Sequence, residues 1–121
     1  KRDIDEDCYY VALKRMQSLS KLQRLSDLKV TAEKLISQEI PDWYKAAPRF
    51  FLGVVKKKSN DLEGAKEDFL WARQRNDFYQ RALITQLLQN GYYDGGTADP
   101  WSIEAENGLE ACLIDQDCMR R

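Results

Sequence analysis

Histidine is absent from the 121 residues of this chain. Without an imidazole, the chain lacks the usual general base near neutral pH, and this excludes Ser–His and Cys–His catalytic pairs and histidine-based zinc sites. Neither a P-loop nor a dinucleotide-binding glycine motif is present. We therefore expect a protein that is not an enzyme and that needs no metal and no cofactor. The acid pair Glu106 and Glu110 is expected to be a solvated helix face.

Long apolar runs, proline and glycine are also scarce. No apolar stretch approaches the roughly 20 residues that a membrane-spanning helix needs, so we expect no membrane insertion. Three prolines and six glycines, with 43% hydrophobic and 32% charged residues, predict one soluble all-α domain over residues 1–121. The chain begins at Lys1 and shows no signal peptide, which leaves a cytoplasmic protein or a processed secreted or periplasmic form as alternatives.

Only three cysteines are present, so at least one stays outside any internal pair. Cys112 and Cys118 are six residues apart, which on one straight helix places them on different faces and about 9 Å apart along the axis. They can bond only if the helix ends between them. No CxxC motif supports a zinc or redox site. We expect buried free thiols, with a Cys112–Cys118 disulfide as the alternative.

The charges are unevenly distributed along the chain, although the net charge is only −1. Residues 1–60 carry 13 Lys and Arg against 8 Asp and Glu, whereas residues 61–121 carry 6 against 12. Oppositely charged helices can attract each other within the fold, or two surfaces can serve two partners. Few aromatic residues lie between the lysines of the basic half, so no nucleic-acid partner is expected.

Apolar residues recur at helical spacing in six segments, which predicts six helices. These cover about residues 4–20, 26–39, 46–57, 62–75, 78–90 and 100–116. Paired in order, they give three antiparallel hairpins, over residues 4–39, 46–76 and 78–118.

Expected helix N-caps are Ser26, Asn60 (in a capping box with Glu63), Asn76, and Asp99 before a proline. Trp43 is expected as a plug between the first and second hairpins, with a surface anchor for a ligand as the alternative.

The middle hairpin, residues 46–78, resembles one tetratricopeptide repeat. The resemblance rests on Leu52-Gly53, on Asn60 to Ala65, and on Phe69 and Ala72. Gly53, Ala65 and Phe69 match the spacing at which the two helices of that family pack together. Arg49, Lys56 and Asp77 depart from it, because they stand where the family has tryptophan, tyrosine and proline. The resemblance implies a right-handed array of helical hairpins whose first helices line a concave groove.

The same resemblance implies the binding residues of this chain. The family's groove positions fall on Ala47, Phe50, Val54, Lys57 and Lys58. That surface is apolar with a basic end, which suits a partner helix or an extended segment with acidic side chains. We therefore expect a non-catalytic adaptor that binds a protein or peptide partner.

A second resemblance concerns residues 80–118. Leu83, Leu87, Gly91-Tyr92-Tyr93, Gly95 and Asp99 are similar to the small peptidoglycan-binding domain of bacterial wall enzymes. Pro100 after Asp99, and the absence of the later glycine and threonine, depart from that pattern. The resemblance implies an alternative function, cell-wall binding, with Tyr92, Tyr93 and Asp99 near the binding surface.

Overall fold

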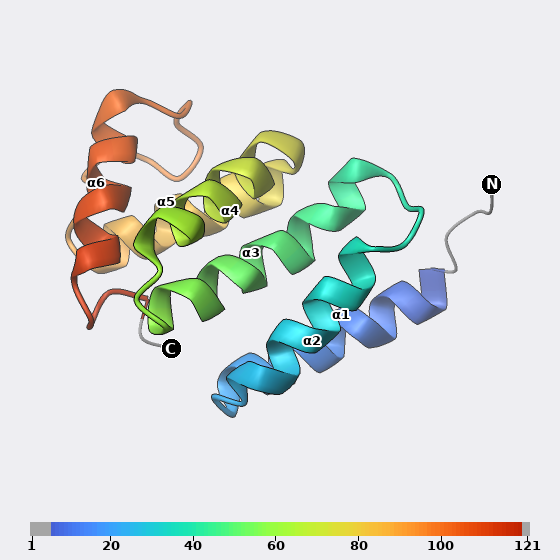
Figure 1. Cartoon of the computed structure of the whole chain (residues 1–121). Coiled ribbons are helices and arrows are strands. Elements are labelled where there is room, and N and C mark those ends of the chain that lie inside the picture. The colour runs from blue at the N-terminus through green and yellow to red at the C-terminus, as the bar shows by residue number, and fades with distance from the viewer. Residues whose placement is uncertain (1–5, 120–121) are drawn as a thin grey trace.

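Six α-helices make up the computed structural model, which describes residues 6–119 (Figure 1). They are α1 (Glu6–Lys21), α2 (Leu25–Ile36), α3 (Asp42–Lys58), α4 (Leu62–Arg75), α5 (Asp77–Gln89) and α6 (Ile103–Ile114). The predicted all-α fold is therefore confirmed. The predicted start of the first helix at Ile4 lies outside the described residues.

Consecutive helices pack against each other, and α3 with α4 forms the most extensive contact. Short turns join α1 to α2 and α3 to α4, whereas residues 90–102 form a long connection between α5 and α6. Helix α6 packs on both α4 and α5. In the view of Figure 1, α1 to α4 run along a common diagonal while α6 runs from top to bottom at the left edge. The last pair is therefore more open than the first two hairpins.

The interior consists of two hydrophobic clusters that meet at α3. The N-terminal cluster is built mainly from α1, α2 and α3, including Met16, Leu28 and Leu52. The C-terminal cluster joins α4, α5 and α6, including Phe69 and Leu109. Phe50 of α3 packs against both clusters, and its ring lies 5.0 Å from that of Phe69 and 5.1 Å from that of Tyr79.

Gly53 allows α3 to approach α4 closely. A Cβ atom at this position would lie 2.8 Å from Cε1 of Phe69, closer than two carbons can pack. Ala65, Phe69 and Ala72 on the facing side of α4 are fully buried. The helix contact predicted from the spacing of Gly53, Ala65 and Phe69 is therefore present.

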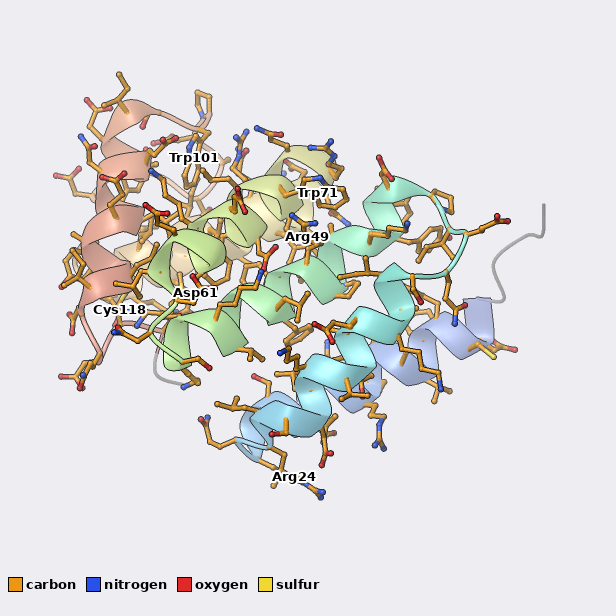
Figure 2. All side chains as sticks on the ribbon, in the orientation of Figure 1. Arg24, Arg49, Asp61, Trp71, Trp101 and Cys118 are labelled. Carbon is orange, nitrogen blue, oxygen red and sulfur yellow. A yellow bond between two sulfur atoms is a disulfide. The ribbon has the colours of Figure 1, made fainter. Side chains whose placement is uncertain are left out.

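A buried carboxylate lies in the same helix interface. Both Nε of Arg49 and Nζ of Lys56 lie 2.9 Å from the oxygens of Asp68, whose side chain is 4% exposed. The Arg49 guanidinium also lies 4.8 Å from the ring of Trp71, and Figure 2 shows the two residues on adjoining helices. Arg49 and Lys56 are two of the three residues that differ from the repeat pattern, and they share one acidic partner.

Two of the predicted N-caps are wrong by one or two residues. Helix α2 begins at Leu25, so Ser26 is already helical, and Arg24 precedes the helix. Helix α4 is capped by Asp61, whose carboxylate accepts from the backbone N–H of Gly64 at 3.1 Å. Asn60 instead has φ of 66° and ends α3, a left-handed conformation that asparagine tolerates.

The last two predicted caps have opposite outcomes. Asn76 caps α5 as expected, because its side chain accepts from the N–H of Phe78. Asp99 does not cap α6, which begins later, after Ser102. The carboxylate of Asp99 accepts instead from the Tyr93 hydroxyl and from the N–H of Gly96, both at 2.8 Å. It therefore closes the connecting loop rather than starting a helix.

Helix α3 begins at Asp42, four residues before the predicted start, so Trp43 is helical. The side chain of Trp43 is 52% exposed and stacks on Tyr44, with ring centroids 4.3 Å apart. The prediction of a buried plug between hairpins is therefore wrong. Trp43 lies on the surface of the first turn of α3.

Because α3 starts early, Pro48 lies in the interior of the helix and not near its first turn. Proline has no N–H, so the carbonyl four residues earlier, that of Tyr44, loses its normal helical donor. The Tyr9 hydroxyl of α1 donates to this carbonyl at 3.1 Å. Burial raises the pKa of Tyr9 to about 12, so this donor keeps its proton at physiological pH. A neighbouring helix thereby supplies the missing hydrogen bond.

We expect a Tyr9→Phe variant to lose about 1 kcal/mol of unfolding free energy, because the Tyr44 carbonyl loses its donor. Pro48→Ala restores a backbone N–H at the helical position, so the Tyr9→Phe loss should fall to less than half in that background. Urea denaturation of the four proteins of this cycle measures the coupling. Tyr10→Phe, at the exposed neighbouring tyrosine, is the control and should change stability by less than about 0.5 kcal/mol. An equal loss in both backgrounds would contradict the compensation.

Candidate functional site

A groove opens where the C-terminal ends of α1, α3 and α6 converge. It has a volume of about 520 Å³. Its walls come from three parts of the chain: the turn between α1 and α2 with the first residue of α2, the C-terminal end of α3 with Asn60, and the end of α6 with the segment that follows it. The lining residues are Gln23, Leu25, Val54, Lys57, Lys58, Asn60, Leu113, Ile114, Gln116, Cys118 and Met119.

Three lining residues have a left-handed backbone. Gln23, Asn60 and Met119 have φ of 59°, 66° and 57°, and they are the non-glycine residues with positive φ within residues 6–119. Gln23 and Asn60 end α1 and α3 in closed turns, in which the next N–H bonds back to the helix, from Arg24 to Leu19 and from Asp61 to Lys56. Carbonyl groups in the last turn of both helices thus accept hydrogen bonds from within the chain. Such conformations persist where the surroundings fix them, and they cluster at binding sites.

The charge of the groove comes from the last turn of α3. Lys57 donates from Nζ to the backbone carbonyl of Asp115 at 2.8 Å, which ties α3 to the segment after α6. Burial, together with the neighbouring Lys58, lowers the pKa of Lys57, while the nearby carboxylates of Asp115 and Asp117 act in the opposite direction. Additional negative charge nearby would stabilise the protonated form of this side chain. The groove therefore combines two cations with the side chains of Leu25, Val54 and Met119.

A disulfide forms part of the wall. Cys112 and Cys118 are bonded, with Cα atoms 5.3 Å apart, and both are buried. Helix α6 ends at Ile114, so the chain reverses and brings Cys118 back over Cys112. The prediction of buried free thiols is therefore wrong for this pair, and the alternative holds because the helix ends between the two cysteines. Cys8 lies exposed on α1 and is not part of this bond.

The five predicted binding residues divide into two groups. Val54, Lys57 and Lys58 line the groove. Ala47 is fully buried in the N-terminal cluster, and the ring of Phe50 packs between Phe69 and Tyr79. The structure thus brings together the C-terminal three. It buries Ala47 and leaves Phe50 partly buried between the two clusters, since the face of α3 that bears them is covered by α2, α4 and α5.

The residues of the wall-binding resemblance are engaged within the chain. The Tyr92 hydroxyl donates to the carboxylate of Asp115 at 2.5 Å, and the Tyr93 hydroxyl donates to Asp99. These bonds raise the pKa of each tyrosine, and the bond from Tyr92 lowers the pKa of Asp115. The pKa of Asp99 is lowered mainly by the Gly96 N–H and further by the Tyr93 hydroxyl. Tyr92 and Tyr93 lie half-buried, and their polar atoms hold the connecting loop and the segment after α6.

The acid pair of α6 has a partner in α4. Lys66 forms ion pairs with Glu110 and, at 3.7 Å, with Glu106. These carboxylates therefore join two helices and are not only a solvated face. Together with Arg49 and Lys56 on Asp68, they show that charges of opposite sign attract within the fold. No group of three or more metal-ligating side chains occurs among residues 6–119.

None of the helices in the described part of the chain has the length and apolar character needed to cross a bilayer. Comparisons with protein-family models, curated proteins and solved structures find no match to this chain.

Sequence reasoning missed the lining residues outside α3. Gln23 and Leu25 lie in and after a turn, and Gln116, Cys118 and Met119 follow the last helix. One signal was available for Asn60, because asparagine directly after an amphipathic helix is typical of a left-handed helix end. For the others, the sequence carries no local signal that they meet α3.

Proposed function

We propose that this chain is a non-catalytic interaction module that binds an extended segment of a partner protein bearing acidic and apolar side chains. The observation that carries the proposal is that Lys57 and Lys58 border the same groove as Leu25, Val54 and Met119. Carboxylates of the segment would pair with the two ammonium groups, and its apolar side chains would cover the groove floor.

The size of the groove favours an extended segment over a helix. Its volume of about 520 Å³ falls in the usual range of ligand pockets, about 300–1,000 Å³. A helix with its side chains is about 10–12 Å across, so this volume would hold little more than one helical turn. An extended segment can insert alternate side chains and leave the others in solvent. We therefore take a short extended stretch as the occupant.

The α3–α4 hairpin supports the architectural half of the proposal, a helical array related to tetratricopeptide repeats. Gly53 packs against Phe69, and Ala65 and Ala72 are buried at the spacing on which that resemblance rests. In this proposal, α3 contributes the groove wall through its last turn rather than along its whole length.

The test uses two fluorescent pools of ten-residue peptides. In the first pool, Asp or Glu alternates with Leu, Ile or Phe; in the second, Lys or Arg replaces the acidic residues. We expect fluorescence anisotropy to show binding of the acidic pool at least tenfold tighter than the basic pool. The affinity should fall as salt is added, because salt screens the exposed charges.

Lys58→Glu should weaken binding of the acidic pool about tenfold, since it replaces attraction with repulsion at the groove. Lys45→Glu is the matched control, because it makes the same change on α3 about 20 Å away along the helix axis. Equal affinity for both pools, or equal losses in the two variants, would refute this site assignment. Binding that is lost only when Tyr92 and Tyr93 are replaced would favour the C-terminal loop instead.

A further inference from the structure

The segment after α6 forms one wall of the groove. Five of the lining residues, Leu113, Ile114, Gln116, Cys118 and Met119, belong to the end of α6 or to the turns after it. They face Val54, Lys57 and Lys58 of α3 across the groove. Displacement of residues 115–119 would therefore remove one side of the site and leave the α3 side in place.

The attachments of this wall are concentrated at its two ends. Near its start, Asp115 accepts from Lys57 through its carbonyl and from Tyr92 through its carboxylate. Near its end, Cys118 is bonded to Cys112 of α6. Met119 follows with φ of 57°, a conformation that side chains rarely adopt. The disulfide and the burial of Cys118 and Met119 in the C-terminal cluster therefore both restrain the far end of the wall.

We propose that reduction of the Cys112–Cys118 disulfide releases residues 115–119 from the groove, so that the redox state of this pair controls binding at the site. This inference rests on the proposed function, since it concerns the same groove. Cys118 is the member of the pair that lines the groove.

The chemistry is thiol–disulfide exchange with a dithiol. A thiolate of the dithiol attacks Sγ of Cys118, the S–S bond breaks, and Cys112 leaves as a thiolate that takes up a proton. The second thiol of the reagent then attacks the mixed disulfide and releases Cys118. Two electrons pass to the protein, which ends with two thiols, and the reagent ends as a disulfide.

Burial couples this reaction to the groove. Cys112 and Cys118 are 0% and 1% exposed, so attack requires local opening of residues 115–119. An occupant that contacts this wall stabilises the closed state and covers Cys118. If reduction weakens binding, then binding must disfavour reduction, because the coupling between the two is reciprocal.

The experiment uses a Cys8→Ser protein, so that the exposed thiol cannot exchange with the disulfide. The oxidised protein is treated with dithiothreitol, and alkylation with mass spectrometry follows the two new thiols over time. Hydrogen exchange should show at least tenfold faster exchange over residues 115–119 after reduction, while exchange in α3 and α4 stays slow and limited by global unfolding. The acidic peptide pool should bind the reduced protein at least fivefold more weakly, and a saturating amount should slow reduction at least threefold.

Each other result overturns the inference in a distinguishable way. Unchanged exchange at residues 115–119 would mean that the wall is held without the disulfide. Exchange in α3 and α4 as fast as that over residues 115–119 would mean that reduction unfolds the domain and does not release this segment alone. Equal binding by both redox forms would refute redox control while the proposed function stands. Absence of binding to the oxidised protein would refute the proposed function, and this inference with it.

Discussion

Replacing Asp68 with Asn is expected to lower the free energy of unfolding by about 2–3 kcal/mol. The change keeps the shape of the side chain but removes the charge that Arg49 and Lys56 share. Removing one member of a buried ion pair usually costs about 3–5 kcal/mol, because the remaining charge stays buried. Here the two cations are 27% and 35% exposed, so water recovers part of the loss.

Glu67→Gln is the matched control for this prediction. Glu67 is the adjacent acidic residue on α4 and lies exposed, so the same chemical change should alter stability by less than about 0.5 kcal/mol. A triple variant, Arg49→Leu, Lys56→Met and Asp68→Leu, should recover most of the stability lost in Asp68→Asn, since it leaves no charge behind. Urea denaturation measures all three. A loss below about 0.5 kcal/mol in Asp68→Asn would show that the carboxylate is not needed.

Loss of the Cys112–Cys118 disulfide is the second large effect that we expect. The bond closes a loop of about seven residues, and the chain-entropy relation gives about 2–2.5 kcal/mol of stabilisation for a loop of this length. A Cys112→Ala, Cys118→Ala protein should therefore unfold at a lower urea concentration with a similar dependence on urea. The m-value should change little, because such a short loop barely alters the surface exposed on unfolding.

Two comparisons make this second prediction specific. Cys8→Ser changes an exposed cysteine outside the bond and should leave stability within about 0.5 kcal/mol of the wild type. Wild-type protein reduced with dithiothreitol should match the double variant, since both lack the loop constraint. If the oxidised and reduced proteins have the same midpoint in urea, the bond contributes nothing to global stability.

The sequence predicted the helices well because amphipathic spacing and buried small residues act locally. Gly91 ends α5 with φ of 82°, and Asn76 starts it as expected. Predictions failed where a side chain had two possible uses. Asp99 before Pro100 is a strong signal for a helix start, yet its carboxylate accepts hydrogen bonds from Tyr93 and Gly96 instead. Which use wins depends on contacts made by the rest of the fold.

Three of the eleven lining residues were predictable, for a related reason. Val54, Lys57 and Lys58 lie on a regular helix, whose geometry is known once the helix is recognised. The facing wall depends on where α6 ends, since one further helical turn would separate Cys112 from Cys118. Asp115 ends the helix at a point that Lys57 and Tyr92, 58 and 23 residues away in sequence, help to fix. Such distant partners leave no trace in the local pattern.

The meeting of two hydrophobic clusters at α3 has a consequence for how cooperatively the chain unfolds. Helices α1 and α2 bury their apolar residues mainly against α3, while α3 itself is also held by α4. The N-terminal pair, which contributes Gln23 and Leu25 to the groove, can therefore open as a unit of its own while α3 to α6 stay folded. Phe50, which contacts both clusters, is the side chain through which strain in one half reaches the other. The packing of one phenyl ring thus bears on whether the domain melts in one step or in two.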